Sequence, residues 1–349
     1  MTAASDRPIE LRSDNAAGIA PEIMAALAVA DEGSALAYGG DPITARLQEL
    51  VRDVFHQPDA QVFPVGSGTA ANSLALSALC PPWGSVLCHE TAHIFVNEGG
   101  ATSLFGGGAV MRGLPGDEYK LHPAGVQRAF DSTNWGDPHH SQPSVVSITC
   151  PTDFGTVYSV QEVAALAALA HGRALTTHLD GARLANALVA LGAAPHELLT
   201  DAGVDAFSLG AIKNGAMGTD AIVCFDPAVS EQLVYRLKRS GHVASKMRYQ
   251  SAQLIAYLTD GLWLRLAKRS NEAMVQLSAG LRALGVDLLA EPEANMLFAR
   301  VGEPAVAALA DAGLLFYAMG NGVLRFVTSF QTTADDVAEV LRRVERVVS

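Results

Sequence analysis

The sequence is poor in charged residues, and basic residues are scarcer than acidic ones. Only 17% of its 349 residues are charged, and 24 Lys and Arg against 36 Asp and Glu give a formal net charge of −12. No basic run is present that could neutralise a phosphate backbone. We therefore expect no nucleic-acid partner.

Paired cysteines and long apolar runs are also missing. The four cysteines lie far apart without a Cys-x-x-Cys pair, so we expect neither a disulfide framework nor a bound metal. The longest apolar stretches, such as residues 163–170, fall well short of the ~20 residues that span a bilayer. Residues 1–8 have no apolar core after their single basic residue. We expect a protein of the reducing cytoplasm that makes no membrane contact.

Apolar residues, in contrast, make up 49% of the chain, enough to bury a sizeable core. Between residues 64 and 225, short β-rich runs alternate with segments of helical periodicity, which is typical of an α/β fold with parallel strands. Ser159-Val-Gln-Glu162 forms a capping box that opens one of the crossover helices. The expected strands are residues 85–88, 109–111, 145–149, 174–179, 206–209 and 221–225.

The pattern changes after residue 225. Long helical stretches are predicted at residues 228–239, 248–258 and 261–284, followed by a short alternation of strands and helices from 295 to 348. We predict a large α/β domain over residues 16–250 and a smaller α+β domain over residues 251–349. The helix at 261–284 could pack against both.

A first motif, Gly66-Ser-Gly-Thr69, follows an apolar run and opens a helix at about Thr69. Helix N-termini attract anions, and the glycines would let the backbone approach a phosphate. No G-x-G-x-x-G or Walker sequence is present, which argues against dinucleotide and nucleoside triphosphate sites. A tight turn with Thr69 as the helix cap explains the motif equally well.

A second motif places Asp180 at the carboxyl end of an apolar strand, with Arg183 three residues later. Ligands of open α/β sheets bind beyond the carboxyl ends of strands. Asp180 could therefore hold a proton on a heteroaromatic ring nitrogen, and Arg183 could pair with Asp180 or with a cofactor. Taken alone, a helix-capping Asp with a local ion pair is the more common explanation.

A third motif is a Gly-rich loop with Lys213 at its centre. An amine in a partly desolvated loop has a lowered pKa and can form a Schiff base. Lys213 is the only Lys or Arg between Arg183 and Arg236, which argues against a solvated basic surface.

The order of a phosphate turn, Asp-x-x-Arg and then a loop lysine is the order that pyridoxal phosphate (PLP) requires. Here the sequence resembles the fold type I PLP enzymes, and among them the low-specificity L-threonine aldolases of the β-eliminating lyase group. The matching segments span nearly the whole chain: Leu11-Arg-Ser-Asp14, Tyr38-Gly-Gly-Asp-Pro42, Gly66-Ser-Gly-Thr-Ala-Ala-Asn72, Ala92-His-Ile94, Glu98-Gly-Gly-Ala101, His178-Leu-Asp-Gly-Ala-Arg-Leu184, Lys213 and Asn295-Met-Leu-Phe298.

The resemblance implies a large domain with a mostly parallel central sheet flanked by helices, a small α+β domain and an active site that includes residues 1–15. It also implies retro-aldol cleavage of threonine, allo-threonine and related β-hydroxy-α-amino acids to glycine and an aldehyde. Lys213 would bind PLP covalently, and Asp180 would face the ring nitrogen. Arg183 would contact the cofactor, and Gly68 and Thr69 would hold its phosphate.

The remaining roles that the resemblance implies concern proton transfer and the substrate. His93 would stack on the ring and assist proton transfer, and Ser13 and Arg325 would grip the substrate carboxylate. Tyr38 would be an active-site tyrosine, and Arg248 would reach the phosphate of a neighbouring subunit, so we expect a homodimer or homotetramer. The pair His139-His140 falls where some relatives place a histidine near the substrate hydroxyl; either residue fits, and we take His139 as the candidate.

Two segments depart from the common family pattern. Around the lysine the chain reads Ile212-Lys-Asn-Gly-Ala-Met-Gly218 instead of Ser-Lys-Gly-Leu-Gly, which resembles a bacterial branch of the family. Where many members have Glu-Asn-Thr-His-Asn-Gly, the chain reads Cys150-Pro-Thr-Asp-Phe-Gly155. A contact made there by His would have to come from Asp153 or from elsewhere.

Other functions fit the same motifs. A phenylserine aldolase or a β-eliminating lyase is an alternative, because the cofactor cradle does not determine which bond is cleaved. An α/β protein that binds a phosphate-bearing ligand without catalysis is a further alternative.

Overall fold

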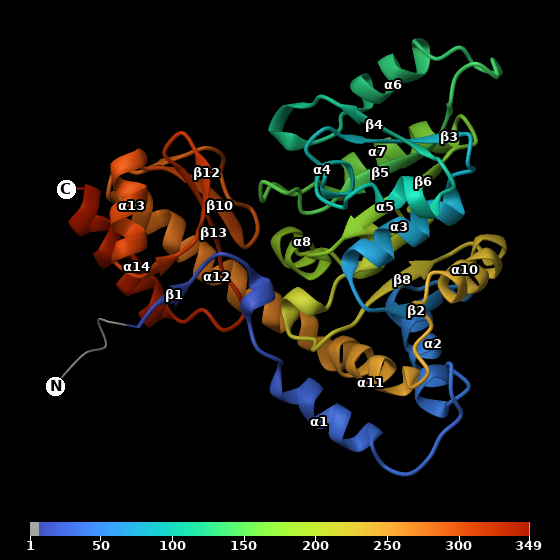
Figure 1. The fold of residues 1–349 in the computed structure, drawn as a ribbon, viewed down its shortest axis with the longest axis horizontal. Coiled ribbons are helices and arrows are strands. Elements are labelled where there is room, and N and C mark those ends of the chain that lie inside the picture. The colour runs from blue at the N-terminus through green and yellow to red at the C-terminus, as the bar shows by residue number, and fades with distance from the viewer. Residues whose placement is uncertain (1–6, 349) are drawn as a thin grey trace.

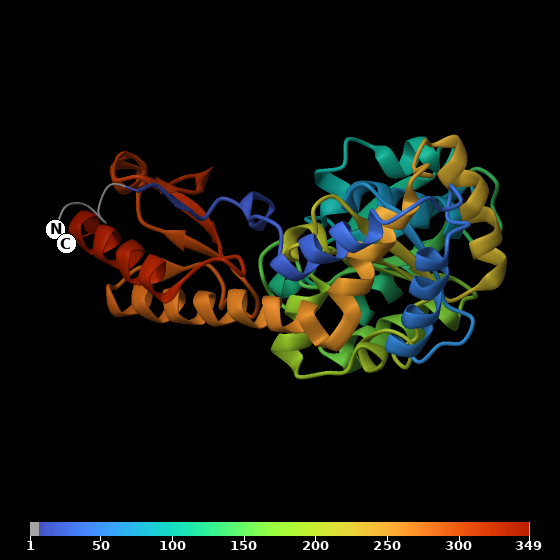
Figure 2. The same ribbon diagram turned by 90° about the horizontal axis from the view of Figure 1, so that it is seen from below.

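The computed structural model describes residues 7–348, which form two unequal units joined by a long helix (Figures 1 and 2). Residues 1–6, which belong to the expected active-site segment 1–15, lie outside the described residues. No helix among residues 7–348 is both long and apolar enough to cross a membrane.

The larger unit is built on a seven-stranded sheet in which only one strand, β8, runs against its neighbours. This mostly parallel sheet confirms the expected fold class, and each of the six expected strands is present to within a few residues. In spatial order the strands are β2 (Gln61–Val65), β8 (Asp220–Cys224), β7 (Ala206–Leu209), β6 (Thr176–Gly181), β5 (Gln142–Thr149), β3 (Gly84–His89) and β4 (Val110–Leu114).

Helices follow most of the strands. The cap predicted for α7 is confirmed, whereas the residue that caps α3 differs from the one considered in the sequence. The predicted capping box opens α7 (Val160–His171): Ser159 accepts a hydrogen bond from the amide of Glu162, whose carboxylate accepts one from the amide of Ser159. Helix α3 (Gly68–Leu79) is capped by Ser67, not by Thr69. The other helices of this part are α4 (His93–Val96), α5 (Ala101–Phe105), α6 (Pro123–Asp131), α8 (Leu184–Leu191), α9 (Pro195–Leu198) and α10 (Pro227–Arg239).

Three helices distant in sequence pack together beside the sheet. They are α1 (Pro21–Ala30), α2 (Pro42–Val54) and α11 (Met247–Leu258), and α11 contacts both others (Figure 1). The expected domain division near residue 250 falls inside α11, which packs with the large unit. The chain crosses to the smaller unit along α12 (Leu262–Ala283), which contacts α8 at the large unit and α14 at the small one, as its sequence suggested (Figure 2).

The smaller unit has the expected α+β composition. Its antiparallel sheet has the order β12 (Tyr317–Gly320), β13 (Val323–Val327), β10 (Met296–Arg300) and β9 (Asp287–Leu288), and it is accompanied by α13 (Glu303–Asp311) and α14 (Ala334–Val348). Near the start of the chain, β1 (Ile9–Glu10) pairs in parallel with β11 (Leu314–Leu315). This pairing directs the residues that follow β1 toward the junction of the two units.

Candidate active site

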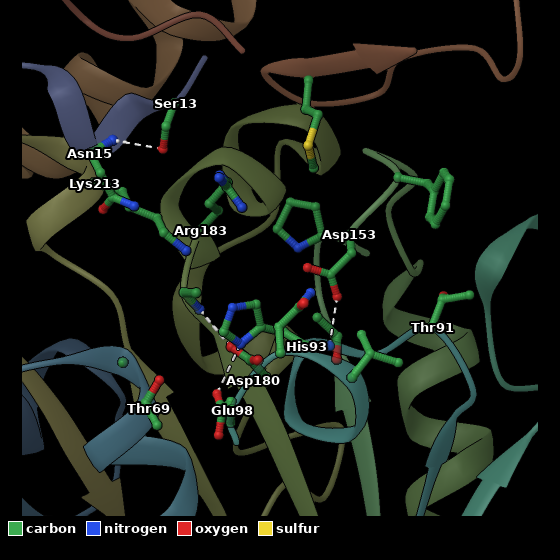
Figure 3. Close-up of a pocket in the computed structure, with 18 of the residues that line it drawn as sticks. Ser13, Asn15, Thr69, Thr91, His93, Glu98, Asp153, Asp180, Arg183 and Lys213 are labelled. Carbon is green, nitrogen blue, oxygen red and sulfur yellow. Dashed lines mark hydrogen bonds and ion pairs between the residues drawn. The ribbon is translucent and has the colours of Figure 1, made fainter. Parts of the chain in front are cut away.

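A cavity of about 910 Å³ lies where the carboxyl ends of β5 and β6 face the small unit (Figure 3). Its walls come from the segment after β1, the start of α3, helix α4, the loops after β5, β6 and β7, and strands β10, β12 and β13. The structure brings together eight of the eleven residues expected to form the site: Ser13, Gly68, Thr69, His93, Asp180, Arg183, Lys213 and Arg325.

The start of α3 forms the part of the cavity best suited to an anion. The first amides of a helix lack acceptors within the helix, and its dipole places partial positive charge there. A Cβ atom at Gly68 would meet a carboxylate oxygen of Asp220 at 3.6 Å, an ordinary contact distance, so this end of the helix is not crowded by other side chains. Gly68 and Thr69 are therefore placed where a phosphate group could bind.

Asp180 is the last residue but one of β6 and is almost completely buried. Its Oδ1 accepts hydrogen bonds from the amide of Ala182 (3.0 Å) and the hydroxyl of Ser208 (3.3 Å), and its Oδ2 accepts one from Nδ2 of Asn72 (3.0 Å). Neither Lys nor Arg forms an ion pair with this carboxylate among the described residues. Its charge is thus available to a protonated nitrogen in the cavity.

Arg183 pairs with Asp14 and not with Asp180. Its Nε and Nη2 donate to the two carboxylate oxygens of Asp14 at 2.7 and 2.9 Å, and Nδ2 of Asn295 donates to the same carboxylate at 3.0 Å. Burial alone would raise the pKa of Asp14, but the charge and hydrogen bonds of Arg183 outweigh it and lower that pKa. Sequence reasoning assigned no role to Asp14, although the matched segment Leu11-Arg-Ser-Asp14 contained it.

Lys213 lies in a 3₁₀ turn (Ile212–Asn214) that is fixed on both sides. Oδ1 of Asp220 accepts from the amides of Ala211 (2.7 Å) and Ile212 (2.9 Å). On the other side, Nδ2 of Asn214 donates to the carbonyl of Trp263 at 2.8 Å. Burial, and then the charge of Arg183, lower the pKa of Lys213, which favours the neutral amine that can attack an aldehyde.

Two glycines allow the Asp180 strand and the Lys213 loop to approach each other closely. A Cβ atom at Gly181 would lie 2.4 Å from the carbonyl oxygen of Ser208, and one at Gly210 would lie 2.2 Å from that of Ala182. The amide of Gly210 also donates to the carbonyl of Gly181 at 3.1 Å. Side chains at these two positions would force the carboxylate and the amine apart.

His93, at the start of α4, is surrounded by carboxylates (Figure 3). Its amide donates to Oδ2 of Asp153 (2.8 Å), and its ring Nδ1 lies 3.0 Å from Oε1 of Glu98. The hydrogen bond with Glu98 raises the pKa of His93 against the opposing effect of burial. Burial, and then the charge of Asp180, raise the pKa of Asp153. Sequence reasoning gave Glu98 no function; the only signal was its place in a matched segment.

Ser13 and Arg325 face the cavity from the side of the small unit. The hydroxyl of Ser13 accepts from the amide of Asn15 at 3.2 Å. Nη2 of Arg325 donates to the carbonyl of Arg12 at 3.1 Å, and the guanidinium lies 4.9 Å from the ring centre of Tyr317. Nε of Arg325 is buried and has no hydrogen-bond partner in the described part of the chain.

The structure does not bring Tyr38, Arg248 or His139 to this cavity. Tyr38 is exposed, with Nζ of Lys238 4.7 Å from its ring centre, and Arg248 donates to the carbonyl of Gly33 at 3.2 Å. His139 is exposed in the loop before β5, at the amino end of that strand, whereas the cavity lies at its carboxyl end. This position does not support the expected catalytic role of His139 in its own chain.

Comparison with known proteins identifies the family. The β-eliminating lyase family model matches residues 10–304. Low specificity L-threonine aldolases of Pseudomonas sp. (strain NCIMB 10558) and Pseudomonas aeruginosa are 39% and 40% identical to this chain, each over 99% of both sequences. The solved threonine aldolase of Leishmania major superposes with a TM-score of 0.90 at 27% identity, covering 97% of this chain and 99% of that one. The chain therefore belongs to the β-eliminating lyase family.

Proposed function

We propose that this protein is a PLP-dependent aldehyde-lyase that cleaves L-threonine, L-allo-threonine and related β-hydroxy-α-amino acids to glycine and an aldehyde. One observation carries the proposal: the start of α3, Asp180 and Lys213 line one cavity, where they can serve the phosphate, the ring nitrogen and the aldehyde of PLP. The full-length identity to low specificity L-threonine aldolases supports this activity over others of the family.

The residues present fit PLP in the roles expected for them. Gly68 and Thr69 would hold the phosphate, Asp180 would face the ring nitrogen and Lys213 would supply the amine, while Arg183, fixed by Asp14, lines the same cavity. When bound, PLP withdraws electrons from Cα of the amino acid, so that the Cα–Cβ bond can break. The chain itself orients the substrate and moves protons.

The small unit and the N-terminal segment bind the substrate in this proposal. Ser13 and Arg325 hold the α-carboxylate, and Arg suits that role because its planar fork matches a carboxylate. His93 uses Nδ1 toward Glu98 and has Nε2 left to accept the β-hydroxyl proton. We propose that the large unit, expected over residues 16–250, holds the cofactor, while the small unit, expected over residues 251–349, acts on the substrate together with residues 7–15.

We also propose that the enzyme is a homodimer or homotetramer in which Tyr38 and Arg248 complete a neighbouring site. Both lie outside the cavity of their own chain, and the amide of Tyr38 donates to the carbonyl of Ser245 at 3.0 Å, which joins the two segments. Sedimentation of the PLP-loaded enzyme tests this proposal. A fully active monomer at assay concentration would refute it.

Phenylserine is a second candidate substrate because one wall of the cavity is aromatic. The rings of Phe154 and Phe298, which both line the cavity, stack with centroids 4.6 Å apart, and Tyr119 stacks on Phe154 at 3.6 Å. Such a wall would contact a β-phenyl group favourably. The same assay therefore compares phenylserine with threonine.

The test is steady-state turnover of L-threonine, L-allo-threonine and L-phenylserine by the PLP-loaded enzyme. Glycine and an aldehyde are the expected products. Ammonia and a ketoacid would instead show a β-eliminating lyase. A yellow protein that turns over none of the three substrates would indicate a ligand-binding protein without this activity.

A further inference from the structure

Glu98 is the one buried residue in an otherwise exposed segment, residues 95–100. Helix α4 ends at Val96, and Gly99 and Gly100 follow with left-handed φ angles of 58° and 76°. This turn lets the chain continue along the surface while the carboxylate of Glu98 points inward, where its side chain has 0% exposure. Placing a carboxylate there costs solvation energy, which must be offset by its contacts.

Those contacts connect His93 with Asp180. Oε1 of Glu98 lies 2.9 Å from Nδ2 of Asn72 and 3.0 Å from Nδ1 of His93. Nδ2 of Asn72 also donates to Oδ2 of Asp180 at 3.0 Å, so one amide group bridges the two buried carboxylates. Oε2 of Glu98 has no hydrogen-bond partner among residues 7–348, nor does Glu98 pair with a Lys or Arg there.

The donors in this cluster determine how the imidazole is protonated. An amide nitrogen can only donate, so Oε1 of Glu98 acts as an acceptor toward Asn72. The arrangement that satisfies both contacts has Nδ1–H of His93 donating to the same oxygen. A neutral His93 then carries its proton on Nδ1 and its lone pair on Nε2, the nitrogen not used by the protein.

We propose that Glu98 is a positioning residue that fixes this tautomer of His93 and offsets the positive charge when Nε2 takes up a proton. The proposal rests on the proposed function, in which the proton comes from the β-hydroxyl of the substrate and the O–H electron pair forms the carbonyl of the aldehyde. Glu98 touches neither substrate nor cofactor in this role. Its effect on the β-hydroxyl proton passes through the imidazole.

The charges around His93 agree with this role. Glu98 faces it from the segment after α4, Asp153 from the loop after β5 and Asp180 from β6. The hydrogen bond with Glu98 is the largest influence that raises the pKa of His93; burial opposes it, and Asp180 and Asp153 add to it. Burial also raises the pKa of Glu98, against the hydrogen bond from His93. Removing the charge of Glu98 should therefore lower the pKa of His93.

The first test measures His93 directly and needs no turnover. Diethyl pyrocarbonate modifies neutral imidazole, so the pH dependence of its rate at His93, followed by peptide mass spectrometry, reports the pKa of this side chain. At pH values where wild-type His93 is mostly protonated, we expect the isosteric Glu98→Gln variant to react about tenfold faster, since a single nearby charge shifts a pKa by one unit or more. The measurement is made with PLP bound and after its removal.

Glu90→Gln is the matched control. Glu90 is exposed, lies three residues before His93, and forms no hydrogen bond with it in the described structure, so this variant loses the same charge without the contact. Its titration should match the wild type. Equal reaction rates in Glu98→Gln and wild type would overturn the proposal. If Glu98→Gln does not fold, Glu98→Asp, which keeps the charge, is compared with wild type and should retain a raised pKa.

The second test is the pH profile of kcat in the PLP-loaded enzyme. His93 must be neutral to accept a proton, so activity falls as the pH drops through its pKa. In Glu98→Gln this fall should move to lower pH, and the plateau should be lower because the base is weaker. KM should change little, since Glu98 does not contact the carboxylate site. An unchanged profile would refute the positioning role, whereas absence of glycine production by the wild type would refute the proposed function and leave the His93 titration valid.

Discussion

Arg325 offers the most direct test of substrate binding, because it lines the cavity without forming an ion pair in the described structure. Arg183 gives two hydrogen bonds to Asp14, whereas Arg325 has no carboxylate partner in the described structure. Its guanidinium donates to the carbonyl of Arg12 and lies over the ring of Tyr317. We therefore expect the substrate carboxylate to be its partner and Arg325→Ala to impair the enzyme strongly.

The magnitude follows from the contact that is lost. A bidentate, charge-assisted contact contributes about 2–4 kcal/mol, which corresponds to a loss of about 30- to 900-fold in kcat/KM. Both constants should change: KM rises because binding weakens, and kcat falls because the carboxylate contact also sets which Cα bond is broken. Arg325→Lys should recover part of the loss, since an ammonium group cannot reproduce the planar fork.

The assay is kcat and KM for L-threonine and L-allo-threonine, with PLP content checked by absorbance. Arg12→Ala is the control, because Arg12 forms an exposed ion pair with Glu10 and its backbone carbonyl, which accepts from Arg325, remains. That variant should behave like the wild type. Unchanged kcat/KM for both substrates in Arg325→Ala would refute the reasoning and leave Ser13 as the only named partner of the carboxylate.

Three further predictions concern the cofactor and stability. Lys213→Ala should lose nearly all turnover and the chromophore that borohydride bleaches. A variant that keeps the chromophore and full activity would show that Lys213 does not bind PLP. Asp180→Ala should fold and bind PLP but lose kcat, and a wild-type kcat at normal PLP content would contradict its role. Burial lowers the pKa of His178 from 6.5 to about 4, so only the unfolded chain takes up this proton between those pH values. Urea unfolding of wild type should therefore lose about 2 kcal/mol from pH 7 to pH 5 relative to His178→Gln, and parallel curves would contradict this.

The sequence predicts those parts of the site that depend on local pattern. Asp180 and Lys213 each follow an apolar strand, and the loops that follow neighbouring parallel strands converge at one edge of a sheet. The capping box of α7 is likewise complete within four residues. For these features the chain segment itself contains the physical cause.

Other parts of the site depend on contacts between residues far apart in the sequence, which no local pattern predicts. Asp14 and Arg183 are 169 positions apart, and they meet because β1 is held by β11. Glu98 looks like an exposed loop residue until Gly99 and Gly100 turn it inward. The resemblance implies that His139 lies near the substrate hydroxyl, but the structure places its loop at the amino end of β5, opposite the cavity. In each case the tertiary arrangement, and not the residue type, decides the environment.

The hydrogen bond from Asn214 to the carbonyl of Trp263 connects the turn that carries Lys213 to helix α12 and so to the small unit. Trp263 lies in the first turn of α12, whose far end carries the small sheet, so any tilt of this helix is transmitted to the residue next to Lys213. We therefore expect substitutions in the small unit that admit bulkier aldehydes to affect PLP retention as well. Variant libraries designed to accept bulkier aldehydes should be screened for loss of PLP during turnover as well as for product.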